Sequence, residues 1–316
     1  MRAETFLRLA RGLLGLTGMV EYAPSLSQRI TRRITQRFRR SATLTEIGTV
    51  GWRYLSMPFG VTRRIGPVAV ASATVTALAV TLIAFALGSL TRGPDFHVYA
   101  DQRTWLGIAH VGDVLSNLAF TVGGAWLLTR TRHTSKPRVV RLAPWLMIAI
   151  GLGSALYHHA PTDATLVADW IPIGLTLACI LGAVAGDRLG PGAGAPAALT
   201  LGAAELLASI GWYTDGGTAG GNLRGHVAVQ VVGVVATAIL ILARPGRIAR
   251  SPVLAALALF ALARVAGSYD LATLDAIGVS GHAIKHLLAA AAATLAIAAI
   301  SPPTAPAVPA RAGSAR

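Results

Sequence analysis

Two short stretches of this apolar chain carry reactive side chains at spacings that could support chemistry. GLGSALYHHAPTDATLVAD, at residues 151–169, contains a serine, two histidines and two aspartates, and SGHAIKH, at residues 280–286, adds two more histidines. A polar group buried without a partner costs on the order of 2 to 7 kcal/mol, and a charge costs more. Polar side chains retained in such surroundings therefore indicate a functional site.

The spacing of the histidines predicts a metal centre. His282 and His286 are four residues apart and project from one helix face, which lets an H-x-x-x-H pair share one ion. With His158 as a third ligand, a tetrahedral Zn²⁺ keeps one open position for water, as catalytic sites do. Imidazole matches zinc better than it matches calcium or magnesium. Ser154, one turn before His158, can hydrogen-bond this water or a developing oxyanion, and Asp169 can take its proton or orient a ligand histidine.

The elements that must position these residues are membrane helices. The chain has 316 residues, 53% of them hydrophobic and 13% charged, and its mean hydropathy of +0.59 is too high for a soluble domain. No alternating strand pattern is visible, and helices satisfy their backbone groups within lipid. We predict an all-α, polytopic helical bundle. Its eight spans, each of roughly 20 residues, are 67–90, 110–129, 142–160, 164–186, 195–213, 225–243, 251–269 and 279–300.

The distribution of basic residues predicts the orientation of these spans. With eight spans, most arginines and lysines outside the membrane fall on the side of the two termini, and only Arg92, Arg103 and Arg224 fall on the other. By the positive-inside rule both termini are cytoplasmic. All five candidate site residues then lie towards the outer leaflet. We expect an integral protein of a bacterial inner membrane.

The chain divides into four predicted parts. Residues 1–66 form a basic cytoplasmic arm, either an interfacial helix that contacts anionic lipids or a disordered segment. Residues 67–90 are an extra span before a seven-helix core at 91–300, and the proline-rich residues 301–316 form a disordered cytoplasmic tail. The net charge of +15 is not accompanied by any nucleic-acid motif, so we expect no nucleic-acid partner.

The other polar residues near the spans have structural interpretations. Four histidines are expected to be interfacial polar residues: His97, His110, His159 and His226. Lys285 is expected to point to another face than the proposed ligands. Glu205 and Arg264 can form a structural ion pair, and Asp270 and Asp275 are expected to be solvated. One polar cluster either braces the site or bonds neighbouring helices: Asp113, Ser116 and Asn117.

These motifs resemble a known family. GLGSALYH, followed by Asp169 and by GHAIKH in the last span, is similar to the alkaline ceramidase family and to the wider CREST superfamily of membrane hydrolases. ADQRTWLGIAHVGDVLSNLAF at 100–120 and APTDATLVADWIP at 160–172 resemble bacterial ceramidase-like members. The resemblance covers about residues 95–300, the last seven spans, and so implies a seven-helix core.

The resemblance also implies an activity. Its zinc ligands match His158, His282 and His286, and its serine and aspartate match Ser154 and Asp169. The implied reaction is attack of zinc-bound water on the amide of ceramide, which gives a sphingoid base and a fatty acid, with substrate entering from the bilayer.

The chain departs from this family in two places, and the function stays open to that extent. The first span and the basic arm lie outside the family core, and His110 stands where animal members carry an acidic calcium ligand, which argues against calcium. The expected substrate is ceramide or a similar lipid amide or ester. The alternative is a non-catalytic membrane receptor or lipid-binding protein with a structural zinc site.

Overall fold

The structure, a computed structural model, describes residues 66–131 and 137–301. The predicted basic arm before residue 66 and the predicted tail after residue 301 lie outside the described residues. About 80% of the described part is helical, and it contains no strand.

Eight helical segments of the described chain are long and apolar enough to cross a membrane, which confirms the predicted all-α bundle with eight spans. They are α4 (Pro67–Ala86), α5 with α6 (Val111–Ser116 and Leu118–Thr131), α7 (Arg138–His159), α8 (Asp163–Arg188), α9 (Pro191–Thr214), α10 (Arg224–Ala243), α11 (Arg250–Ser268) and α13 (Gly281–Ile300). Three short elements lie between them: η2 (Pro94–His97), η3 (Gly217–Ala219) and α12 (Asp270–Ile277).

Local sequence signals set the helix ends. Thr162 caps α8 through a capping box with Thr165, and the Ser280 side chain accepts a hydrogen bond from the Ala283 N–H at the start of α13. The first span ends at Ala86 rather than at the predicted residue 90. Gly88 follows with a φ of 66°, the left-handed conformation that commonly terminates helices.

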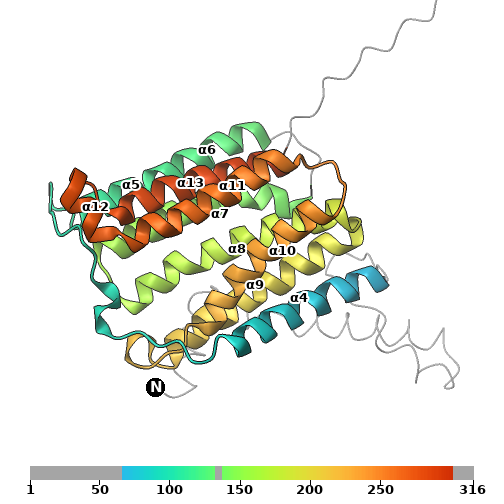
Figure 1. Cartoon of the computed structure of the whole chain (residues 1–316), viewed down its shortest axis with the longest axis horizontal. Coiled ribbons are helices and arrows are strands. Elements are labelled where there is room, and N and C mark those ends of the chain that lie inside the picture. Colours follow the sequence, from blue (N-terminus) through green and yellow to red (C-terminus); the bar gives the residue numbers. More distant parts are fainter. Residues whose placement is uncertain (1–65, 132–136, 302–316) are drawn as a thin grey trace, which may run out of the picture. The chain divides into compact units, whose positions relative to one another are not determined.

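The helices pack around α8 and α13 (Figure 1). α8 contacts α7, α9 and α10, while α13 packs extensively on α11 and α6. α4 packs against α9 and α10 at the edge of the bundle and is mostly exposed, as expected for a span whose outer face contacts lipid. Because α8 and α13 are central, polar side chains on their inner faces are removed from water.

One end of the bundle carries the connections that cover the site. All three short elements belong to this end. η2 lies between α4 and α5, η3 lies between α9 and α10, and α12 lies between α11 and α13. α12 lies in the segment between the last two spans, and the hydropathy pattern did not predict a helix there. The break between α5 and α6 falls at Asn117, whose side chain donates to the Asp113 carbonyl one turn earlier.

Candidate metal centre

Three histidines from two helices meet at one point. His158 near the end of α7 and His282 and His286 at the start of α13 offer ligand atoms that all lie within 4.8 Å of one another. The ring centroids are 4.7 Å apart for His158 and His282, 4.9 Å for His158 and His286, and 4.7 Å for His282 and His286. All three side chains are buried. The structure therefore brings the predicted ligands together, in a group that can hold a metal ion.

The polar environment of the rings fits a metal site. Nδ1 of His286 lies 2.8 Å from the Ser116 hydroxyl and 3.2 Å from the Asp113 carbonyl oxygen, which leaves Nε2 free to bind an ion. Nδ1 of His158 is buried and has no hydrogen-bond partner among the described residues. A buried ring nitrogen without a partner is costly, and a cation would satisfy it.

Ser154 and Asp169 lie beside the histidines. Both are buried and line one cavity together with His286, and the Ser154 hydroxyl is a hydrogen-bond neighbour of the Asp169 carboxylate. Oδ1 of Asp169 is buried and lacks a partner within the described chain. One carboxylate oxygen of Asp169 therefore lies next to the three rings without a hydrogen-bond partner among the described residues.

The polar cluster at the start of the second span braces the site, which decides between the two interpretations that its sequence left open. Besides the contact of Ser116 with His286, the Ser280 hydroxyl donates to Oδ1 of Asp113 over 2.5 Å. The same Ser280 caps α13. The cluster thus ties the start of α13, and with it His282 and His286, to α5.

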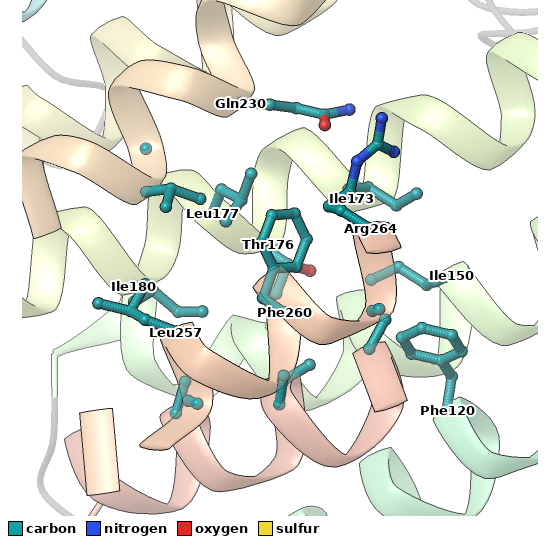
Figure 2. A pocket seen from close by; sticks show the side chains of 18 of the residues that line it. Phe120, Ile150, Ile173, Thr176, Leu177, Ile180, Gln230, Leu257, Phe260 and Arg264 are labelled. Atoms are coloured by element: carbon teal, nitrogen blue, oxygen red, sulfur yellow. The ribbon is translucent and has the colours of Figure 1, made fainter. Parts of the chain in front are cut away.

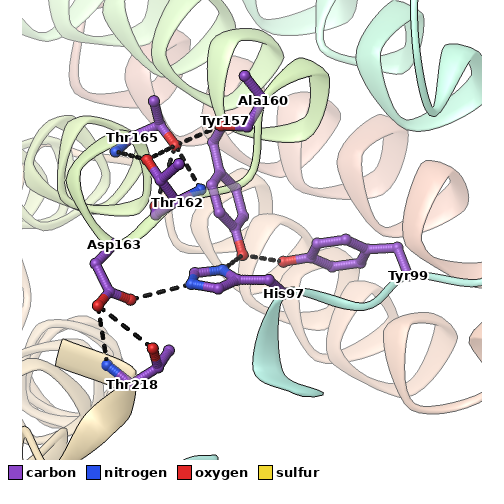
Figure 3. Close-up of polar contacts among 8 residues, drawn as sticks. All are labelled: His97, Tyr99, Tyr157, Ala160, Thr162, Asp163, Thr165 and Thr218. Carbon is purple, nitrogen blue, oxygen red and sulfur yellow. Dashed lines mark hydrogen bonds and ion pairs between the residues drawn. The ribbon is translucent and has the colours of Figure 1, made fainter. Parts of the chain in front are cut away.

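A loop before α5 covers the rings. The Tyr99 ring lies 4.5 Å from both His158 and His282, measured between centroids. The Tyr99 hydroxyl donates to the Tyr157 hydroxyl at 2.7 Å, and the Tyr157 hydroxyl lies 3.0 Å from Nδ1 of His97. Nε2 of His97 in turn lies 3.0 Å from the Asp163 carboxylate (Figure 3). Burial, followed by the proximity of Tyr157, raises the pKa of the Tyr99 phenol above its ordinary value of 10, so it stays protonated and donates.

A buried carboxylate anchors this loop. Burial of Asp101 disfavours its charge, but hydrogen bonds from the Arg103 side chain at 2.6 Å, the Arg103 backbone and the Gly112 N–H outweigh that effect and lower the Asp101 pKa. Arg103 also donates to the Gly278 carbonyl, and its own pKa is raised, chiefly by the bond to Asp101. The loop is thereby joined to the segment that precedes α13.

Two expectations about the residues around His282 are wrong. Lys285 does not point to another helix face: its Nζ lies 3.0 Å from Nε2 of His282, because residues three apart on a helix are neighbours. Asp270 is not simply solvated, since its carboxylate accepts hydrogen bonds from the backbone N–H groups of Ala100 and His282. Asp275 is exposed, as predicted.

The expected ion pair between Glu205 and Arg264 is also wrong. The fully buried Glu205 accepts from Ser209 at 2.6 Å and contacts Nδ1 of His226 at 2.9 Å. His226 is therefore buried rather than interfacial, and it stacks on Trp170 with ring centroids 4.2 Å apart. An acidic group on α9 found its partner on the neighbouring helix α10.

The other histidines of the described residues are not part of the ligand group. His159 is exposed, His97 belongs to the chain of contacts that ends at Asp163, and Nδ1 of His110 lies 2.6 Å from the His158 carbonyl.

Sequence reasoning missed two contributors to the site, Tyr99 and Lys285. For Lys285, its position three residues after His282 was a usable signal. Nothing in the spacing of Tyr99, in a loop, pointed to the rings. Comparisons of this chain with protein-family models, with characterised proteins and with solved structures found no match.

Proposed function

We propose that the chain is a zinc-dependent membrane hydrolase that cleaves the amide bond of ceramide or a similar N-acyl lipid. The observation that carries the proposal is the convergence of three buried histidines, with Ser154 and Asp169 beside His286 at one end of an apolar cavity. Three imidazoles suit Zn²⁺ and leave a coordination position open, as catalytic sites require. A zinc ion held there would supply a Lewis acid that polarises the carbonyl and makes water more acidic.

The roles of the two other residues follow from their positions. Asp169, with one oxygen unengaged, accepts the proton of the attacking water. Once this proton neutralises Asp169, Ser154 turns its single hydroxyl hydrogen from Asp169 to the carbonyl oxygen, on which negative charge develops. The water oxygen bonds to the carbonyl carbon, the carbon–nitrogen bond breaks, and the leaving amine takes up the proton. The products are a fatty acid and an amine.

The rest of the cavity suits an acyl chain. Beyond the metal end its walls are mainly apolar side chains from α8, α10, α11 and α13 (Figure 2). α11 packs closely on α13 and only sparsely on α10, so the cavity borders the lipid-facing side of the bundle between α10 and α11. This supports entry of a lipid from the bilayer, with the site towards the outer leaflet in the predicted orientation.

The test is turnover by the purified full chain in detergent. Zinc is measured by elemental mass spectrometry, and fatty-acid release is followed from labelled ceramide and from other N-acyl lipids. We expect Asp169→Asn to lower release roughly 10²- to 10⁴-fold, and Ser154→Ala roughly 10²- to 10³-fold, with zinc content unchanged. His286→Ala should lose the metal itself.

His159→Ala is the matched control, because His159 is adjacent to a proposed ligand but exposed and outside the group. It should keep both zinc and activity. A chain that binds zinc but releases no fatty acid from any lipid would instead support a non-catalytic receptor or lipid-binding protein with a structural metal. A wild-type chain that binds no zinc contradicts the proposal altogether.

A further inference from the structure

A second cationic side chain faces the cavity besides Lys285. Arg264, one turn before the end of α11, lines the cavity, and Figure 2 shows its guanidinium group together with the Gln230 amide. Neither Arg264 nor Lys285 makes an ion pair within the part of the chain that the structure describes. Unpaired cations within a membrane span are costly, and they commonly mark the path or binding site of a ligand.

The cations and the proposed catalytic residues share one end of the cavity. Asp169 lies six residues from the start of α8, Gln230 six residues from the start of α10, Arg264 four residues from the end of α11 and Lys285 four residues from the start of α13. At 1.5 Å per residue, all four lie about 6 to 9 Å from the same end of the bundle. This end of the cavity is its polar end.

The carboxylates at the polar end lie around Lys285. Arg264 lies within electrostatic range of both Lys285 and His282. Asp169 is the carboxylate that lines the cavity with them, and the proposed mechanism uses it. Asp113 and Asp270 also act electrostatically on Lys285, whereas no carboxylate of the described residues forms an ion pair with Arg264. Arg264 is therefore a cation that lines the cavity without an ion-pair partner among the described residues, which favours an anionic ligand beside it.

Gln230 presents an acceptor to the same space. Its Nε2 lies 2.6 Å from Nε2 of His226, and Nδ1 of His226 lies 2.9 Å from the buried Glu205. The Gln230 amide nitrogen can only donate, so Nε2 of His226 accepts this hydrogen bond and Nδ1 of His226 donates to Glu205. The Gln230 oxygen is then left for a ligand that can donate a hydrogen bond.

The opposite part of the cavity is apolar over a considerable length. From His286 to Ala296 on α13, and from Asp169 to Ile180 on α8, the lining extends for about 15 Å along each helix axis. Thr176 and Thr237 are polar members of this stretch, and the Thr176 hydroxyl donates to a backbone carbonyl of its own helix. A ligand with one long apolar chain and an anionic head matches both halves.

We propose that this site selects N-acyl lipids whose amine portion carries a carboxylate, as in an N-acyl amino acid. The inference rests on the proposed function and specifies its substrate. The acyl chain occupies the apolar stretch and the amide lies at the three histidines. The carboxylate binds the planar fork of Arg264, while Gln230 accepts from the amide N–H. Hydrolysis adds water across the carbon–nitrogen bond and releases a fatty acid and a free amino acid.

The experiment compares two lipids that differ in the head group alone, N-oleoylglycine and the uncharged N-oleoylethanolamine. Release of oleate is measured with the zinc-loaded full chain in detergent, and binding of both lipids is measured by calorimetry with the Asp169→Asn variant, which should not turn them over. The test variant is Arg264→Gln. Arg250→Gln, at the opposite end of α11, is the matched control with the same change of charge.

We expect wild type to prefer N-oleoylglycine in kcat/KM and in affinity, and Arg264→Gln to lower both values roughly 10- to 100-fold for this lipid. The values for N-oleoylethanolamine should change less than about threefold, within the size of a lost neutral contact. Arg250→Gln should change kcat/KM and affinity for neither lipid, and the zinc content should stay constant in both variants.

The outcomes separate the two proposals. Release of oleate with no preference for the carboxylate, or an equal loss for both lipids in Arg264→Gln, overturns the head-group inference and leaves the hydrolase intact. An equal loss would indicate that Arg264 supports the bundle instead. Selective binding that depends on Arg264, with no release from either lipid, overturns the hydrolase and keeps the anionic head-group site.

Discussion

At the residue scale, the three histidines are held by different kinds of contact. The His286 ring is fixed through Nδ1 by Ser116 and the Asp113 carbonyl, so its proton and its orientation are both defined. His282 is positioned through its backbone, whose N–H donates to Asp270 at 2.9 Å. The Tyr99 ring lies against His158. Among the described residues, Ser116 and the Asp113 carbonyl therefore orient the His286 ring in the manner of metal sites, whereas the His282 ring contacts the Lys285 ammonium group.

Ser116→Ala should weaken zinc binding without removing a ligand. Loss of the hydroxyl frees the His286 ring and its tautomer, and partners of this kind contribute roughly 10- to 100-fold to metal affinity. Competition with a zinc-binding dye measures the change. Thr129→Ala is the control, because the Thr129 hydroxyl bonds to a backbone carbonyl of the same span on an exposed surface. Equal affinity in wild type and Ser116→Ala would show that the ring needs no such support.

At the element scale, small residues let the helices approach closely enough to share a site. A Cβ atom added at Gly153 on α7 would lie 2.5 Å from the Ala168 carbonyl oxygen of α8. This contact lies directly beside Ser154 and Asp169, which come from the same two helices. Close backbone approach through small residues is the usual basis of helix association in membranes.

Gly153→Ala should therefore separate α7 from α8 at the site. We expect a loss of about 1 to 3 kcal/mol in stability from overpacking, and lower hydrolytic activity because Ser154 moves away from Asp169. Thermal unfolding in detergent and fatty-acid release measure the two effects. At Gly211 in α9 an added Cβ atom meets no neighbour within 4 Å, so Gly211→Ala should leave both unchanged or slightly raise stability. Similar behaviour of the two variants would rule out a packing role for Gly153.

At the scale of the whole molecule, the site occupies one end of the bundle. The end of α7 and the starts of α8 and α13 meet there, under η2 and the loop that follows it (Figure 1). The basic residues between spans gather at the other end, among them Arg188, Arg244 and Arg247. From this asymmetry the positive-inside rule predicts that the site lies towards the outer face.

Cysteine labelling tests this orientation. The native Cys179 is buried, so it gives little background. Asp275→Cys, at an exposed position of α12, should react with a membrane-impermeant maleimide on intact cells. Arg247→Cys, whose native side chain is 99% exposed at the other end, should react only after permeabilisation. The reverse pattern would place the histidines on the cytoplasmic side and exclude the proposed orientation.

Much of the fold could be predicted from sequence, because the bilayer imposes a simple rule on the chain. A run of apolar residues long enough to cross lipid must be helical, so the eight spans emerged with shifts of only a few residues at their ends. The predictions that were wrong concerned the partners of buried charged side chains. Glu205 was predicted to pair with Arg264 but contacts His226. Asp270 was predicted to be solvated but accepts hydrogen bonds from backbone N–H groups. Hydropathy says that a buried charge needs a partner and does not identify it.

The sequence by itself determined that this is a helical membrane protein, and that His282 and His286 share one face, since helix geometry fixes residues four apart. Only the tertiary structure decided that His158, more than a hundred residues away, meets them, and that Tyr99 and Lys285 lie against the same rings. The reason is that contacts between helices depend on side-chain packing across the whole bundle. No local spacing along the chain encodes that packing.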